Sequence, residues 1–224
     1  MLTFDSRFYS NTDCSPCAEI SIEVPEAISN RKISETINNA IREEVISILS
    51  FDEEKSITDI PTALISFNQG YEDLKTLFPD ESIPWEAWIK GKIAFENKDL
   101  VTIELSSYIF TGGAHGYGSR RFLNFDKNKA VELSGDELFN NQQKFLDFAE
   151  SQFRLKQNIP EGVSINSTGF MFERDIFYLP ENIGFTQDGL ILLYNPYEVA
   201  SYADGTIELT LPYKEVSEYL AIRI

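Results

Sequence analysis

The sequence predicts an α+β fold with antiparallel sheets and packed helices, arranged as two adjoining α+β subdomains. Three observations indicate this class. Strand-like segments follow one another through short polar turns such as ENKD and TQDG, which is typical of antiparallel hairpins. Helical segments lie between groups of strands and do not alternate with single strands, as they would in a doubly wound parallel sheet. The chain also lacks internal repeats and low-complexity tracts.

The first predicted elements are a strand and a helix. Residues 18–24 alternate between apolar and polar side chains, which predicts a strand that ends at Pro25. A helix is expected within ISNRKISETINNAIREEVISILSF (28–51), with Ser29 or Asn30 as its cap. Its apolar positions recur at helical spacing and are Ile33, Ile37, Ile41, Val45, Ile48 and Leu49.

A second helix is predicted over residues 62–78. Gly70 weakens it by roughly 1 kcal/mol relative to alanine, and Pro79 closes it. Its apolar stripe consists of Leu64, Phe67, Tyr71, Leu74 and Phe78.

The rest of the chain reads as strands and two further helices. Two long strands over 85–95 and 100–110 flank the ENKD turn, and a third strand covers 118–126. The later elements are a helix over 140–157, two strands around TQDG, a strand over 206–212 and a terminal helix over 213–220.

The segment 127–135 is the expected boundary between an N-terminal and a C-terminal portion. The predicted organisation is an N-terminal extension (1–15), an N-terminal domain (16–126) and a C-terminal domain (127–224).

The composition limits the classes of partner. The chain has 224 residues and a formal net charge of −17, so its surface repels nucleic acid and anionic lipid. The same charge attracts a basic partner, although it also serves solubility alone. No run of about 20 apolar residues is present. The first ten residues lack the features of a signal peptide, and Met1 is compatible with a native start or with one that replaces a removed export signal.

The two cysteines, Cys14 and Cys17, form a C-x-x-C pair. A zinc site would need further ligands, and a thioredoxin-like site would open a helix, whereas this pair precedes a predicted strand. A local disulfide and two free thiols remain open. A disulfide would indicate an oxidising compartment.

The only histidine, His115, lies in the glycine-rich segment FTGGAHGYG. A catalytic base would need a nucleophile, and no G-x-S-x-G elbow is present. A metal site would lack further histidines, and a phosphate cradle would need a following helix. Four glycines in seven residues instead favour a turn between two strands. We therefore interpret His115 first as structural, second as a binding residue and last as catalytic.

The segments YIFTGGAHGYGSRRFLNFD and VELSGDELF resemble the motif of the PdaC/RsiV-like extracytoplasmic domains. The C-terminal segment around YEVASYADG and PYKEV is similar to the second domain of that family, and the resemblance covers roughly residues 16 to 220. The motif residues, with a binding or structural role, are Thr111, Gly112, Gly113, His115, Gly116, Asn124, Asp126, Tyr197 and Glu198.

The resemblance implies an α+β fold in two adjoining domains and a place in the bacterial cell envelope, after removal of an export signal, as a periplasmic protein or a surface lipoprotein. One family member is the outer part of an anti-sigma factor that binds lysozyme. Another is the non-catalytic N-terminal part of a peptidoglycan deacetylase. This chain shows neither a sigma-binding segment nor a deacetylase domain, so neither activity is carried over.

Two functions follow from these observations. The first is a non-enzymatic binding module that recognises a basic protein such as lysozyme, or peptidoglycan, without a cofactor or a metal. Exposed rings would then contribute to the contact. The candidate rings are Trp85, Trp88, Tyr117 and Tyr197, although packing in the core or at its rim is the more common role of such rings. The alternative is a hydrolase of cell-wall polymers that uses paired carboxylates, with Asp126 and Glu198 as the first candidates.

Overall fold

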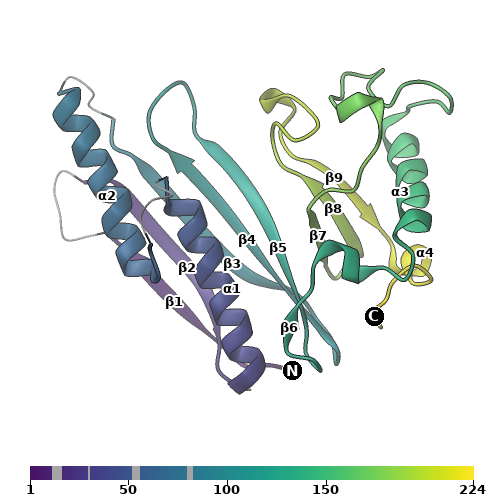
Figure 1. The fold of residues 1–224 in the computed structure, drawn as a ribbon, viewed down its shortest axis with the longest axis horizontal. Coiled ribbons are helices and arrows are strands. Elements are labelled where there is room, and N and C mark those ends of the chain that lie inside the picture. The colour runs from purple at the N-terminus through teal and green to yellow at the C-terminus, as the bar shows by residue number, and fades with distance from the viewer. Residues whose placement is uncertain (12–16, 30, 52–55, 80–82) are drawn as a thin grey trace. The chain divides into compact units, whose positions relative to one another are not determined.

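The computed structural model describes residues 1–11, 17–29, 31–51, 56–79 and 83–224. It contains a six-stranded sheet in the order β1-β2-β3-β4-β5-β6 and a three-stranded sheet in the order β7-β8-β9, accompanied by helices (Figure 1). The predicted α+β class is therefore confirmed. The strands are β1 Phe4–Ser10, β2 Glu19–Ala27, β3 Glu86–Glu96, β4 Leu100–Phe110, β5 Tyr117–Asp126, β6 Val131–Glu132, β7 Asn182–Phe185, β8 Leu190–Tyr194 and β9 Ile207–Leu211. The helices are α1 Arg31–Leu49, α2 Ile60–Leu77, α3 Gln142–Gln157 and α4 Tyr213–Val216, with short 3₁₀ turns at Gly135–Leu138, Glu173–Asp175 and Tyr202–Asp204.

The chain forms two compact units. The N-terminal unit comprises Leu2–Lys92 and Leu105–Gly118, and the C-terminal unit comprises Ile93–Glu104 and Ser119–Ile224. These limits differ from the boundary expected at 127–135, because β3, β4 and β5 contribute residues to both units. The 127–135 segment itself contains β6, which pairs with β5.

The predicted N-terminal extension (1–15) contains the strand β1, which the sequence did not predict. β1 pairs with β2 along its whole length, from Phe4 opposite Ala27 to Ser10 opposite Ser21. β2 pairs in parallel with β3, which departs from the expected antiparallel pairing. The reason is the connection: α1 and α2 lie between β2 and β3 and return the chain to the same end of the sheet.

β2 continues through Pro25, where the sequence predicted its end. The parallel pairing with β3 stops at Glu23 opposite Lys90, so no ladder hydrogen bond is needed from the Pro25 nitrogen on that side. Gly91 on β3 makes room for the proline ring, because a Cβ on Gly91 would lie 2.6 Å from Pro25 Cδ.

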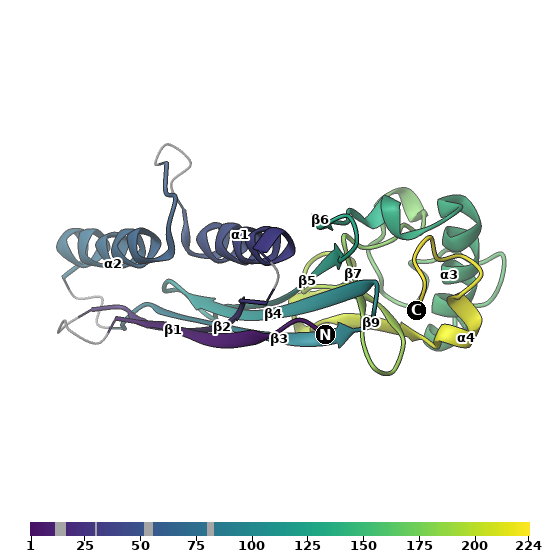
Figure 2. The ribbon, with the colours of Figure 1, turned by 90° about the horizontal axis from the view of Figure 1, so that it is seen from below.

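In the N-terminal unit, α1 and α2 lie on one face of the sheet (Figure 2). The predicted apolar positions of α1 are buried, apart from the half-buried Ile48, together with Ile20, Ile22 and Val24 of β2. Asp59 caps α2 by accepting a hydrogen bond from the Thr62 backbone N–H. Trp85, one of the candidate binding rings, packs in a cluster of aromatic rings. Its partners are Phe51, Phe67 and Tyr71.

The core of the C-terminal unit is dominated by aromatic side chains between α3 and the three-stranded sheet. Phe153 of α3 contacts four other rings edge-on or at a tilt, and these belong to Phe170, Phe172, Phe177 and Tyr194. α4 ends at Val216, well before the predicted residue 220. The helix stops because the backbone of Tyr219 and Ala221 pairs with Asn140 and Leu138.

Candidate functional site

The glycine-rich segment joins β4 to β5 in the N-terminal unit. Gly112 and Gly113 have φ values of +100° and +87°, which other residues adopt only with strain. Gly116 has a different role: a Cβ there would lie 2.4 Å from Cζ of Tyr108. The Tyr108 ring is in turn stacked on Trp88, with ring centroids 6.1 Å apart. The segment is thus a turn that packs at Gly116 against the Tyr108 ring.

His115 is exposed at this turn. Its Nδ1 lies 3.0 Å from the carbonyl oxygen of Gly116, the next residue. Thr111 precedes the two positive-φ glycines and is half-buried. In the part of the chain that the structure describes, no group of three or more His, Cys, Asp or Glu side chains is arranged to hold a metal ion. Cys14 lies outside the described residues, so a disulfide with Cys17 stays a prediction.

Asn124 connects β5 to β7 inside the C-terminal unit. It is only 4% exposed; its Nδ2 donates to the carbonyl oxygen of Ile183 at 2.7 Å, and its Oδ1 accepts from the Thr102 hydroxyl at 2.8 Å. With a hydrogen bond at each of its two polar atoms, this side chain links β5 to β4 and to the start of β7.

A second asparagine makes a similar link, which the sequence analysis missed. Asn195 Oδ1 accepts from the Arg120 backbone N–H at 2.8 Å, and Asn195 Nδ2 donates to the Arg120 carbonyl oxygen at 3.0 Å. The amide therefore binds β5 as a neighbouring strand would. The sequence signal for Asn195 was its place in the NPYE segment, before the motif residues Tyr197 and Glu198.

The Arg120 side chain lies between two carboxylates. Its Nε donates to Glu104 Oε1 at 3.0 Å, and its Nη1 pairs with Glu208. Its guanidinium also lies over the Phe122 ring, 5.6 Å from the centroid. Because Glu104 is only 5% exposed, this cation neutralises a buried charge.

Asp126 closes the turn that follows β5. Its Oδ1 accepts hydrogen bonds from the backbone N–H groups of Asn128 at 2.8 Å and Lys129 at 2.9 Å. Its Oδ2 lies 3.6 Å from Lys129 Nζ. These contacts are those of a turn-forming aspartate.

Tyr197 and Glu198 follow β8. Tyr197 has a φ of +73° and packs its exposed ring against Tyr202, with centroids 5.5 Å apart. Burial raises the pKa of the Glu198 carboxyl, and hydrogen bonds from Asn195 oppose the shift only in part. The two acids proposed for a hydrolase thus have different surroundings, since Asp126 is occupied in its turn.

Replacing Glu198 by Gln is expected to raise the melting temperature at neutral pH. A carboxyl with a raised pKa in the folded state opposes folding when it is ionised, and this penalty is relieved as the pH falls through the folded-state pKa. The gain should therefore shrink towards about pH 4. Thermal unfolding at both pH values, with the exposed Glu161→Gln as control, measures it. A lower melting temperature at neutral pH would contradict the assignment.

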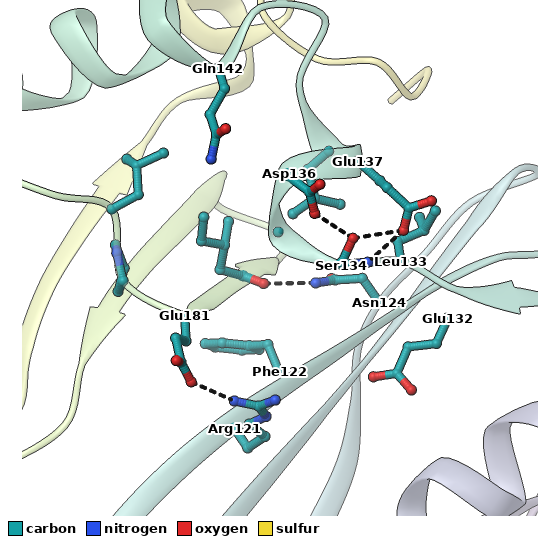
Figure 3. A pocket seen from close by; sticks show the side chains of 15 residues that line it. Arg121, Phe122, Asn124, Glu132, Leu133, Ser134, Asp136, Glu137, Gln142 and Glu181 are labelled. Atoms are coloured by element: carbon teal, nitrogen blue, oxygen red, sulfur yellow. Dashed lines mark hydrogen bonds and ion pairs between the residues drawn. The ribbon is translucent and has the colours of Figure 1, made fainter.

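The C-terminal unit contains a hollow of about 650 Å³ between β5, β6, the 3₁₀ turn Gly135–Leu138 and the start of β7 (Figure 3). Its walls include Phe122, Leu179 and Ile183, and Gln142 reaches it from α3. The charged side chains around the hollow are Arg121, Glu132, Asp136, Glu137 and Glu181.

Hydrogen bonds fix the acids of the 3₁₀ turn. The Ser134 hydroxyl faces Asp136 and Glu137 (Figure 3), and Glu137 also accepts from the Ser134 backbone N–H at 2.9 Å. The hydroxyl of Ser134 lowers the pKa of Asp136, and the backbone N–H of Ser134 lowers the pKa of Glu137. Arg121 Nη1 lies 3.8 Å from Glu181. The hollow therefore carries four carboxylates and one cation.

Two family models match the chain. One, described as deacetylase PdaC, matches residues 12–117, and one, described as a protein of unknown function (DUF3298), matches residues 136–214. The chain combines a PdaC-like part with a DUF3298 part. Eight of the 15 residues that line the hollow, as well as Asn195 and Glu208, lie in the DUF3298 part, whereas the glycine-rich turn lies in the PdaC-like part.

Solved structures of the DUF3298 family have the same fold. A family member from Bacteroides fragilis is 20% identical, with a TM-score of 0.75, over 99% of this chain and 94% of that one. A DUF3298 family protein from Pseudomonas aeruginosa is 19% identical, with a TM-score of 0.62, over 98% and 94% of the two chains. No curated protein matches the chain. No helix in the described part of the chain is long and apolar enough to cross a membrane.

Proposed function

We propose that the protein is a non-enzymatic binding module of the bacterial cell envelope and that it recognises a basic protein. The observation that carries this proposal is the hollow of the C-terminal unit, where four carboxylates surround one cation. A lysine or arginine side chain of a partner fits such a site, because it would add the cationic charge that the hollow lacks.

The charge of the whole chain supports the same partner class. With a formal net charge of −17, the protein attracts a basic partner over a distance set by the salt concentration. The lowered pKa values of Asp136 and Glu137 keep both groups ionised under mildly acidic conditions. The binding of a cation would therefore persist when the pH falls below neutral.

The surroundings of the candidate catalytic residues support binding over chemistry. His115 is an exposed turn residue, and Asp126 accepts two backbone hydrogen bonds in its own turn. A pair of carboxylates for glycoside hydrolysis needs an acid and a nucleophile or base on opposite sides of a substrate. The Asp126 carboxylate already accepts hydrogen bonds within its own turn, which competes with a role as catalytic acid, base or nucleophile.

The envelope location rests on the PdaC-like part of the chain and on the resemblance of the C-terminal part to RsiV-like domains. The C-x-x-C pair is compatible with an oxidising compartment. Lysozyme is the basic protein that this resemblance suggests first, and soluble peptidoglycan fragments are the alternative ligand.

Calorimetric titration with hen egg-white lysozyme tests the proposal. The triple variant Glu132→Gln, Asp136→Asn and Glu181→Gln should weaken binding about tenfold, because it removes the charge of three of the four carboxylates around the hollow. A matched control removes three acids elsewhere, with Glu161→Gln, Asp188→Asn and Glu218→Gln, and should change the affinity little. Moderate salt should weaken the wild-type interaction.

Three outcomes would overturn the proposal. The first is no heat change with lysozyme at high micromolar concentration, combined with binding to peptidoglycan fragments, which would favour the glycan. The second is equal weakening by the site and control variants, which would show that only the net charge matters. The third is release of reducing ends from peptidoglycan that is lost in Asp126→Asn, which would support a hydrolase.

A further inference from the structure

Among the described strands, β1 lies at an outer edge of its sheet. It is the first strand of the six-stranded sheet, and in the described part of the chain its other side faces no strand. The backbone groups of successive β1 residues point to opposite sides. At the two ends of the strand, the Thr3 carbonyl oxygen accepts from the Ile28 N–H and the Asn11 N–H donates to the Ile20 carbonyl oxygen, so both residues bond on the β2 side. In an antiparallel ladder every second residue bonds to the same neighbour, so Asp5, Arg7 and Tyr9 also direct their backbone groups towards β2. The backbone groups of Phe4, Ser6 and Phe8 therefore point outward.

The charges of β1 select one way in which two such edges can pair. Because even-numbered residues point outward in both copies, an antiparallel pair of β1 strands is centred on a residue, and among these registers only the one centred on Ser6 places opposite charges of the two strands against each other. A pair centred on Asp5 places two aspartates opposite each other, and one centred on Arg7 places two arginines opposite each other. Centring on Ser6 instead places Asp5 of each copy opposite Arg7 of the other.

We propose that the outer edge of β1 pairs with β1 of a second copy of this chain, centred on Ser6. The two copies would then share one continuous sheet across a two-fold axis. Phe4 of each copy lies opposite Phe8 of the other on the open face of the sheet. Within each copy, Arg7 Nε already lies 2.6 Å from Glu26 Oε2. Asp5 of the other copy would add a second carboxylate beside this arginine.

Exposed apolar side chains beside this edge support pairing. Phe8 is 69% exposed on β1, and Ile65 of α2 is 70% exposed. Both line a hollow between β1 and the start of α2, together with Tyr9 and Leu64. An exposed edge with large apolar neighbours is the kind of surface that proteins use for strand-to-strand association.

The high net charge opposes the association of two copies at long range, whereas the Asp5–Arg7 pairs act at contact distance. Salt screens the long-range repulsion first, so the dimer should become tighter between low and moderate salt. This response is opposite in sign to that expected for lysozyme binding, and the two proposals can fail separately.

Sedimentation velocity of the wild-type protein at about 100 µM tests the proposal, a concentration at which an interface with a Kd near 10 µM is mostly dimeric. Ser6→Pro removes an outward N–H and leaves the β1–β2 ladder intact, so it should weaken the dimer at least about tenfold. Asp5→Arg opposes arginines across the interface and should do the same. Ser6→Ala is the control and should remain dimeric.

Mixing two single variants tests the register. Asp5→Arg and Arg7→Asp should each be monomeric, and an equal mixture should form a heterodimer, because arginines then face aspartates throughout. Melting temperatures establish that each variant is folded. A monomeric wild type, a dimer that persists in Ser6→Pro and Asp5→Arg, or a mixture that stays monomeric would each overturn the proposal.

Discussion

Replacing Arg120 by Met is expected to lower the free energy of unfolding by about 2–4 kcal/mol, because it removes the cation beside a buried carboxylate. Glu104 is 5% exposed, and its Oε1 accepts from Arg120 Nε at 3.0 Å. The expected loss lies at the lower end of the range for broken buried ion pairs, because the Arg120 side chain remains partly in contact with water. Urea unfolding followed by circular dichroism measures the loss.

The control is a second substitution that removes the buried charge. Glu104→Gln combined with Arg120→Met should recover at least half of the lost stability, since neutral groups of similar size replace both ions. Glu208→Gln with Arg120→Met should recover less, because Glu208 is more exposed. If the free energy of unfolding of Arg120→Met lies within about 0.5 kcal/mol of the wild-type value, the Arg120–Glu104 ion pair does not stabilise the fold.

Replacing Asn124 by Leu is expected to lower the free energy of unfolding by a similar amount, about 2–4 kcal/mol. The substitution keeps the side chain's size but removes the donor to the Ile183 carbonyl oxygen and the acceptor for the Thr102 hydroxyl. Both partners are buried, and each unsatisfied polar group costs about 1–3 kcal/mol. Thermal and urea unfolding both report this loss.

Thr102→Val provides the matched background. With the Thr102 hydroxyl already absent, Asn124→Leu should cost less than it does alone, and the difference measures the coupling between the two side chains. Asn124→Asp should be more harmful than Asn124→Leu at neutral pH, because a carboxylate would face the Ile183 carbonyl oxygen. Fully additive effects of the Thr102 and Asn124 substitutions would contradict the described hydrogen bond.

The candidate site was predictable in part. Asn124 and Asp126 stood out in the NFD segment, and the glycine spacing indicated the turn that contains His115. Arg120 and Asn195 did not stand out, because they are 75 residues apart and their pairing exists only in the folded chain. The hollow combines residues from β5, β6 and the segment before β7, and no local pattern marks such an assembly.

The sequence alone determined the elements whose evidence is local. Hydrophobic period 3.6 marked α1, α2 and α3, period 2 marked β2 and β4, and a run of rings and branched residues marked β3, because residues one period apart along an element face the same side. The tertiary structure decided what the chain brings together across long separations: the parallel pairing of β2 with β3, the addition of β1 as an edge strand, the continuation of β2 past Pro25 and the asparagine links to β5. These depend on which backbone groups remain to be paired once the core has formed, and that is a property of the folded chain.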